Sequence, residues 1–542
     1  MKVFLLLVYL SVVTSTTIAR VSPRQSTNSV VAWSRVAQAF AMSLPYTRSS
    51  RNLAILHVAI HDSLSSIQTR YSPYDYGLSP RVPGASLDAA VFAASRLVLS
   101  NQYPAMTVAI DAKYFDDIGS LSNSNSVIAL GVWVGESVAN AVVTSAALDG
   151  STQANSPPYP GDNTTDGMWR PTPPLFEQAL DPEWGDVMPW CIVTGGNSRR
   201  RRKRRQVLTD GVFFPAPPPG LSPGYADDLE YVAIVGGSYS TNRTIEQTVS
   251  ALFWDSVSPV SWSALASSVS TDIGFDAVDS ARLAAVTSMA IADSVIMAWS
   301  AKYAYGRWRP VSAVQATYNI SWWPLLITQP TPDYISVDAA FAGSASAVMS
   351  RFFGNVSELA YTLYADNGAF MSYSDLTMAA KEAAISRVYG GVHFKLSTDV
   401  GLFYGQAAGN WIYDNCLPQP PLPDTEMSTT TTTTDYNDTG TFEPDWPEPQ
   451  ENFPLSERAV TIMGSIVFTF FTTWITIWAV TRCRVQCRDK GYCCCRCCKK
   501  RPCPPGACCS RCRRGGHHNA TFVELDESHS EIDIRREGVD VL

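Results

Sequence analysis

The stretch KYAYGRWRP, residues 302–310, ends a long apolar segment, and SRVYGGVH, residues 386–393, follows it further along the chain. Together they supply three cations, Lys302, Arg309 and Arg387, and one imidazole, His393. The forked N–H donors of arginine match the oxygens of a tetrahedral anion, and a neutral, oriented histidine is a competent nucleophile. These two stretches therefore predict an oxyanion pocket in which His393 can bond to the central atom of the anion.

The segments around these stretches have the periodicity of helices. Apolar residues recur at helical spacing from Leu53 to Ile67, and similar patterns run over residues 87–99, 127–148 and 279–299. Proline and glycine separate the segments, and strand-like alternation is scarce. The sequence therefore predicts an all-α fold in which one helical bundle of roughly 380 residues forms the main folded part.

The spacing Lys-x6-Arg-Pro followed by Ser-Arg-x5-His resembles the vanadium-dependent haloperoxidases and the type 2 phosphatidic acid phosphatase superfamily to which they belong. Three further stretches resemble the haloperoxidase branch: AILHVAIHD (54–62), DGMWRPTP (166–173) and AWSAKY (298–303). The resemblance spans about residues 31–411 and implies a helical bundle of haloperoxidase type. It makes Lys302, Arg309 and Arg387 ligands of vanadate or phosphate, and His393 the residue that binds vanadate or becomes phosphorylated.

The middle motif departs from this pattern. The family has Pro-Ser-Gly-His, or a close variant, where this chain has PDYISVDAAF, residues 332–341. Ser336 remains as an oxyanion donor, but Val337 replaces the glycine and Asp338 replaces the histidine that acts as general acid and base. With His393, Asp338 is the candidate catalytic residue, because it could still donate a proton if burial raised its pKa. An aspartate beside three cations tends to stay ionised and to repel an anion, so we expect the substitution to impair catalysis. Phosphatase relatives often have an aspartate four residues after the histidine, and Asp399 is the candidate substitute here.

Two other sets of titratable residues, the pair His57 and His61 and the single Asp293, are better explained by structural roles. His57 and His61 lie four residues apart on one predicted helix, which is compatible with a metal site, but His57 falls within the apolar stripe and is better interpreted as a packing residue. Asp293, within the apolar segment 279–299, is interpreted as a structural cap or buried partner. We assign no metal ligands.

The two ends of the chain predict export and membrane anchoring. Residues 1–19 have the charge, apolar run and small residues of a secretory signal, although a buried first strand or helix is the alternative. The uncharged apolar run 459–480 is about 22 residues long, enough to span a bilayer, and basic residues follow it. These features predict a single-pass type I protein of the cell surface or of a viral envelope.

The cysteines are distributed in agreement with this topology. Of 13 cysteines, only Cys191 and Cys416 precede the apolar run, so we predict that they form a disulfide bond. The cytoplasmic tail, residues 481–542, holds the others among basic residues, which favours palmitoylation over zinc binding. The predicted palmitoylation sites are Cys493, Cys494, Cys495, Cys497 and Cys498.

Between signal and anchor, the predicted ectodomain covers residues 20–415, with a Pro-rich, polybasic insertion at about 151–222, and is followed by a Pro/Thr-rich stalk, residues 416–458. The insertion contains seven consecutive basic residues, 199–205, which predict cleavage after Arg204 or Arg205 by a furin-like protease; a nuclear-import or polyanion-binding patch is the alternative. Glycosylation sequons in the exported part begin at Asn163, Asn242, Asn319, Asn355 and Asn437.

Composition limits the functional classes. The chain is 46% hydrophobic and only 17% charged, with a net charge of −8, so nothing favours nucleic-acid binding. We carry two hypotheses. In the first, the ectodomain binds a small oxyanion or phosphate ester, with vanadate as a possible cofactor, and acts as a haloperoxidase or phosphatase with a degenerate site. In the second, it is a non-catalytic surface or viral envelope glycoprotein that keeps the bundle as a scaffold and is activated by furin-like cleavage.

Overall fold

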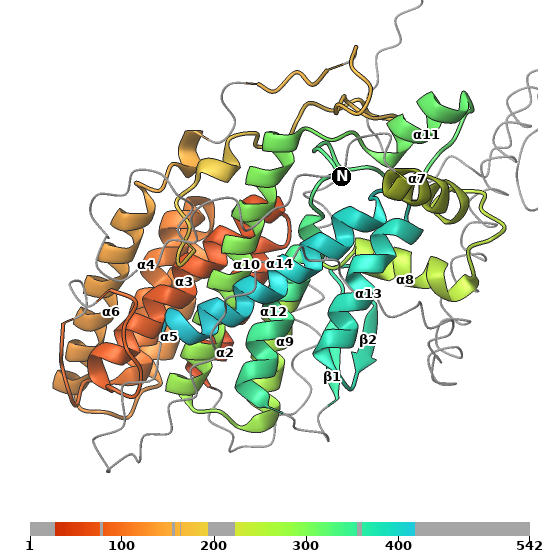
Figure 1. Cartoon of the computed structure of the whole chain (residues 1–542). Coiled ribbons are helices and arrows are strands. Elements are labelled where there is room, and N and C mark those ends of the chain that lie inside the picture. The colour runs from red at the N-terminus through yellow and green to blue at the C-terminus, as the bar shows by residue number, and fades with distance from the viewer. Residues whose placement is uncertain are drawn as a thin grey trace, which may run out of the picture. The chain divides into compact units, whose positions relative to one another are not determined.

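The long helix α10, Ala277–Tyr305, runs through the middle of the fold (Figure 1). Asp276 begins it by accepting hydrogen bonds from the backbone N–H groups of Val278 and Asp279, and Gly306 ends it with a left-handed backbone, φ 56°. Side chains are buried on all sides of α10, as expected for a core helix rather than a surface helix. It packs against α3 and α12, and so joins the N-terminal and C-terminal groups of helices.

The computed structural model describes residues 28–75, 80–153, 158–162, 164–192, 223–354 and 360–417, all within one compact unit. Helices dominate these residues, which confirms the predicted all-α class. The remaining α-helices are α2 (Ser29–Ala41), α3 (Tyr46–Ile67), α4 (Leu87–Gln102), α5 (Thr107–Gly119), α6 (Asn125–Ala146), α7 (Pro223–Val235), α8 (Ile245–Asp255), α9 (Pro259–Ile273), α11 (Pro310–Tyr318), α12 (Val337–Phe353), α13 (Leu376–Tyr389) and α14 (Lys395–Asn415). The predicted helices at 53–67, 87–99, 127–148 and 279–299 correspond to α3, α4, α6 and α10.

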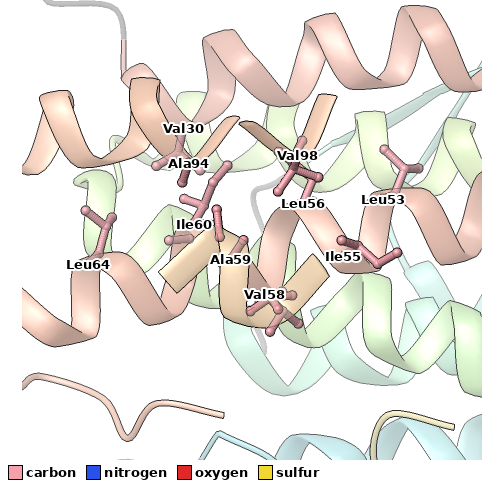
Figure 2. Packing of buried hydrophobic residues seen from close by; sticks show 14 of the residues in the cluster. Val30, Leu53, Ile55, Leu56, Val58, Ala59, Ile60, Leu64, Ala94 and Val98 are labelled. Atoms are coloured by element: carbon pink, nitrogen blue, oxygen red, sulfur yellow. The ribbon is translucent and has the colours of Figure 1, made fainter. Parts of the chain in front are cut away.

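The N-terminal helices form one part of the core. The apolar stripe of α3, including Leu56 and Ile60, meets Val30 of α2 and Ala94 and Val98 of α4 in one buried cluster (Figure 2). Burial of large aliphatic side chains contributes about 1.5–3 kcal/mol each. This cluster holds α3 in place beside α10, and α3 begins at Tyr46, close to the site described below.

The C-terminal part is built around the pair α12 and α14. Gly401, Gly405 and Gly409 line the face of α14 that touches α12, and a Cβ atom at Gly405 would overlap the carbonyl oxygen of Ala340. The absence of side chains lets the two backbones approach closely. The backbone N–H of Ser336, at the start of α12, also donates to the carbonyl of Ser397 in α14, at 2.9 Å. The first turns of the two helices are therefore fixed relative to each other.

The small remainder of the fold is a hairpin and irregular chain. Strands β1 (Tyr361–Tyr364) and β2 (Phe370–Tyr373) pair antiparallel, with Tyr361 opposite Tyr373, and β1 packs against α9 (Figure 1). The described part of the predicted insertion, up to residue 192, contains only the short 3-10 helices Ser151–Gln153 and Trp184–Asp186; another, Pro104–Met106, lies before α5.

Two of the described helices, α6 and α10, are long and apolar enough to cross a membrane by length and composition. Both pack against other helices of the same unit, α6 against α4 and α10 against α3 and α12. The predicted signal, membrane span and cytoplasmic tail, and the predicted stalk beyond residue 417, lie outside the described residues.

Candidate functional site

The predicted site residues come from the ends of four helices. Lys302 lies in the last turn of α10, and Arg309 directly precedes α11, whose first residue is proline. Asp338 lies in the first turn of α12, after the N-cap residue Ser336. Arg387 lies in the last turn of α13, and His393 in the short connection from α13 to α14.

A glycine turn presents His393. Gly391 has φ 74°, and a Cβ atom on it would overlap the carbonyl oxygen of Gly236. The backbone N–H of Val392 donates to the carbonyl of Arg387 at 3.1 Å, which closes the turn. The turn thus directs His393 toward the residues that precede α11 and α12.

Both ring nitrogens of His393 have defined partners. Nε2 lies 3.0 Å from Nη1 of Arg309, and Nδ1 lies 2.9 Å from Oδ1 of Asp333. Because a guanidinium only donates, Nε2 accepts, and Nδ1 carries the proton and donates to the carboxylate. Burial lowers the pKa of His393 well below its ordinary value, and the cations of Arg309, Lys302 and Arg387 lower it further. His393 is therefore a neutral imidazole whose lone pair is on Nε2.

Asp333 is a functional residue that the sequence analysis missed. Its Oδ1 also accepts from the backbone N–H of Phe394 at 3.3 Å, and its Oδ2 accepts from the hydroxyl of Ser397. Burial raises its pKa to about 6, against the opposing effects of Arg309 and the Ser397 hydroxyl. Asp399, which we considered as the partner of the histidine, instead pairs with Lys395, one turn earlier on α14. The helical spacing of i to i+4 favours that pair, and the open question of Asp399 is answered by Asp333, which is the partner of His393.

Lys302 and Arg309 are held by backbone carbonyls. The Nζ of Lys302 donates to the carbonyls of Pro332, at 2.8 Å, and Asp333, at 3.3 Å. Arg309 donates to both the carbonyl and the hydroxyl of Thr331, at 2.7 and 2.8 Å, and to the carbonyl of Val392 at 2.7 Å. Burial lowers the pKa of Arg309 to about 10 and, together with Arg309, lowers that of Lys302 well below its ordinary value. The hydrogen bonds fix both cations around the loop that carries Asp333.

Arg387 differs from these two cations, because part of its guanidinium has no hydrogen-bond partner. Its Nη2 donates to Oδ1 of Asp255 at 3.2 Å, but Nε and Nη1 make no hydrogen bond to any described residue. Nε lies 3.6 Å from Oδ2 of Asp338, too far for a hydrogen bond. Burial acts to lower the pKa of Arg387, but Asp338 and Asp255 raise it above its ordinary value. Arg387 thus stays charged and keeps two donor atoms available.

Asp338 has hydrogen-bond acceptors without a partner, just as Arg387 has donors without one. It is 4% exposed, and neither of its carboxylate oxygens makes a hydrogen bond to a described residue. Ser336 is fully buried and caps α12 by accepting from the backbone N–H of Ala339 at 3.4 Å. That bond uses the hydroxyl oxygen as acceptor and leaves its hydrogen as a donor.

The cationic groups and the imidazole are enclosed in the protein. Lys302, Arg309, Arg387 and His393 are each no more than 1% exposed. A cavity beside Asp333 and Ser397 is also lined by Tyr225, Asp228 and Arg307, and none of the four site residues lines it. The structure therefore brings the predicted residues together in one place, which the surrounding protein encloses.

Other predicted residues have separate roles or lie elsewhere. Cys191 and Cys416 form the predicted disulfide, with Cα atoms 6.1 Å apart. Asn242 and Asn319 are exposed, as glycosylation requires. The remaining sequons (Asn163, Asn355 and Asn437), the cleavage residues (Arg204 and Arg205) and the tail cysteines lie outside the described residues.

The structural interpretations of His57 and Asp293 agree with the structure. His57 bonds to the hydroxyls of Ser34, at 3.0 Å, and Ser288, at 2.7 Å, and burial lowers its pKa to about 4. Asp293 accepts from three consecutive backbone N–H groups, those of residues 190–192, at 2.6, 2.7 and 2.9 Å. Within the described ranges, no cluster of three or more His, Cys, Asp or Glu side chains is arranged to hold a metal ion.

Comparison with known proteins supports the resemblance seen in the sequence. Residues 282–323 and 318–418 match the family model described as the VCPO second helical-bundle domain, and this region contains every residue of the predicted oxyanion site. No curated protein sequence matches the chain significantly.

Solved structures show the same fold. A bacterial vanadium-dependent iodoperoxidase superposes with a TM-score of 0.62 at 22% sequence identity, over 73% of this chain and 98% of that one. A holo-type bacterial vanadium-dependent chloroperoxidase gives a TM-score of 0.53 at 15% identity, over 69% of this chain and 92% of that one. An apo-type bacterial vanadium-dependent chloroperoxidase also gives a TM-score of 0.53 at 15% identity, over 67% of this chain and 92% of that one. Residues 282–418 thus match a haloperoxidase domain family, and the fold of the chain is similar to that of vanadium-dependent haloperoxidases.

Proposed function

We propose that the ectodomain binds vanadate or phosphate among Arg387, Lys302, Arg309 and His393. The observation that carries this proposal is the pair of buried donors on Arg387, Nε and Nη1, which have no hydrogen-bond partner among the described residues. A buried charged donor without a partner is costly, and an oxyanion supplies the missing acceptors in the forked geometry that arginine prefers. The donor set therefore fits a tetrahedral oxyanion.

Each residue has a distinct part in this proposal. Arg387 and Lys302 balance the negative charge of the oxyanion, and His393 offers the Nε2 lone pair. In the structure, the Nε2 lone pair accepts a hydrogen bond from Nη1 of Arg309. Binding of an anion through His393 therefore requires Arg309 to turn its Nη1 toward the anion. Asp333 keeps the proton on Nδ1 and fixes the plane of the ring. Vanadate, when bound, supplies the activation of peroxide toward halide.

Asp338 sets the limit on turnover. It occupies the position from which the family's histidine exchanges protons, and its carboxylate faces Arg387. Three cations in this site are balanced by the carboxylates of Asp333, Asp338 and Asp255, so the net attraction for a dianion is weaker than the cations alone would give. We infer an oxyanion-binding protein whose enzymatic activity, as haloperoxidase or phosphatase, is impaired.

We further propose that this ectodomain is part of a type I membrane glycoprotein cleaved in the basic run. The supporting observations are the exposure of Asn242 and Asn319 and the disulfide between Cys191 and Cys416. Cysteines on both sides of the basic run would keep the two products covalently joined after cleavage. Gel mobility with and without reductant, after furin treatment, tests this: joined fragments are expected to separate only when the disulfide is reduced.

Vanadate binding is tested by thermal unfolding of the purified protein, because a ligand that binds the folded state raises its melting temperature. We expect Arg387→Met to reduce vanadate affinity by about 100-fold, the effect of leaving a buried charged contact unmade. Arg351→Met is the matched control, since Arg351 is exposed and pairs with Asp414 at the surface. Equal vanadate affinity of Arg387→Met and wild type would refute the proposal.

Turnover is tested separately. Hydrolysis of a phosphomonoester or bromination of a phenol dye, if present in the wild type, is expected to disappear in His393→Ala. Saturable vanadate binding without either reaction would favour the alternative of a non-catalytic surface glycoprotein that retains the bundle.

A further inference from the structure

The site contains an unpaired acceptor as well as an unpaired donor. Both oxygens of Asp338 and the Nε and Nη1 atoms of Arg387 lack hydrogen-bond partners among the described residues, although both residues are more than nine-tenths buried. They face each other at 3.6 Å, which is close enough for charge attraction and too far for a hydrogen bond. A ligand that completes the site must therefore satisfy both side chains.

The position of Asp338 is fixed by its surroundings. It lies in the first turn of α12, whose start is capped by Ser336 and tied to Ser397 of α14. Close glycine contacts also join α12 to α14. These contacts hold the Asp338 carboxylate beside Arg387.

The hydrogen-bonding capacities of Asp338 and Arg387 are complementary. Arg387 faces Asp338 directly, with Nε 3.6 Å from Oδ2. The charge of Asp338 also opposes the lowering of the pKa of Lys302 and of Arg309. A carboxylate accepts hydrogen bonds and donates none, whereas a guanidinium only donates.

We propose that Asp338 makes this site selective for oxyanions that carry a hydroxyl hydrogen. Such an ion accepts from Arg387 through its bare oxygens and donates to Asp338 through its O–H. Hydrogen phosphate and protonated vanadate meet both requirements. Sulfate at neutral pH carries no hydrogen, so no hydrogen bond could form between a sulfate oxygen and the Asp338 carboxylate, because both only accept. This inference rests on the proposed oxyanion binding and specifies which oxyanions the site prefers.

The same reasoning extends to phosphate esters. A phosphomonoester dianion has no hydroxyl hydrogen on phosphorus, whereas its monoanion has one. The site is therefore expected to take a phosphomonoester as the monoanion and to hold free hydrogen phosphate more tightly than the ester dianion.

The test compares hydrogen phosphate with sulfate, which at mildly alkaline pH are dianions of similar size. Calorimetric titration of the purified full-length protein should show phosphate binding at least about 10-fold more tightly than sulfate, because the sulfate complex leaves a buried carboxylate unsatisfied. In Asp338→Asn the ratio should fall close to one, since the amide N–H can donate to a sulfate oxygen.

Asp255→Asn is the matched control. Asp255 contacts Arg387 from the partly exposed side, with 42% of its side chain accessible. Removing its charge should change the affinity for both anions in parallel and keep their ratio. If net charge alone set the selectivity, the two aspartate variants would behave alike.

The outcomes separate the two proposals. Equal affinity of the wild type for phosphate and sulfate would overturn the selectivity and leave oxyanion binding intact. Loss of selectivity in Asp255→Asn as well as in Asp338→Asn would overturn the role of Asp338. Absence of binding by phosphate, vanadate and sulfate to the wild type would overturn the proposed function and this inference with it. The wild-type ratio decides the question even if Asp338→Asn does not fold.

Discussion

Replacing Asp333 by Asn should stabilise the fold and damage the site. Asp333 is 2% exposed, and burial raises the pKa of its carboxyl to about 6 from an ordinary value of 3.8. The ionised form is therefore disfavoured in the folded state, by about 3 kcal/mol at neutral pH. Asparagine resembles the neutral carboxyl in shape, can still accept from Nδ1 of His393, and carries no charge to bury. We expect Asp333→Asn to raise the free energy of unfolding by up to about 3 kcal/mol near neutral pH.

The sign of the pH dependence gives a second check. Because the folded-state pKa is raised, the folded protein holds this proton more tightly than the unfolded chain. The contribution of Asp333 to stability is therefore greatest below pH 3.8 and is lost as the pH rises through about 6. The advantage of the Asn variant should be present above about pH 6 and should vanish near about pH 4.

Urea unfolding with the disulfide intact, followed across this pH range, measures both effects. Asp414→Asn is the control, because Asp414 is exposed and its replacement should change stability by less than about 0.5 kcal/mol. In Asp333→Asn, the affinity for vanadate should fall by about 10- to 100-fold, as expected when the partner that orients a ligating histidine is weakened. A variant that is less stable than wild type at neutral pH, or whose advantage grows on acidification, would refute the reasoning.

Three further predictions concern the fold. Asp293→Ala leaves three buried backbone N–H groups without their acceptor and should lower the free energy of unfolding by at least about 3 kcal/mol in urea titration. Gly405→Ala should lower it by about 1–3 kcal/mol, because the methyl group overlaps the carbonyl of Ala340; an unchanged urea midpoint would contradict the close contact. Cys416→Ser removes the bond to Cys191 and should cost about 2–5 kcal/mol, with reductant affecting the wild type and leaving the variant unchanged.

The helices could be predicted from sequence because their signals are local. The apolar stripe of α3, with Leu56 and Ile60, is visible within a few turns of the chain, and the structure places it in the core. The start of α10 was placed at Asp279, two residues late, because the capping role of Asp276 depends on side-chain geometry that periodicity does not show.

The site was predicted only in part. Lys302, Arg309, Arg387 and His393 occur in recognisable motifs, and the structure brings them together. Asp333 was missed because its role depends on a contact 60 residues away along the chain, although it stands three residues before Ser336 in the quoted middle motif.

Asp255 was missed for the same reason. It belongs to α8, and its contact with Arg387 spans 132 residues of sequence. Neither aspartate lies at a spacing from its partner that helix or strand periodicity would reveal, so only the tertiary fold could identify them.

The glycine-lined contact between α12 and α14 has a consequence for how this site can evolve. Because the two backbones touch, the contact with α14 holds the first turn of α12 in place. A substitution at position 338 therefore changes the functional group while its Cα position is retained. Aspartate and histidine codons differ by a single nucleotide. One nucleotide change would thus replace the Asp338 carboxylate by an imidazole that can transfer protons, and the backbone of α12 would not have to change.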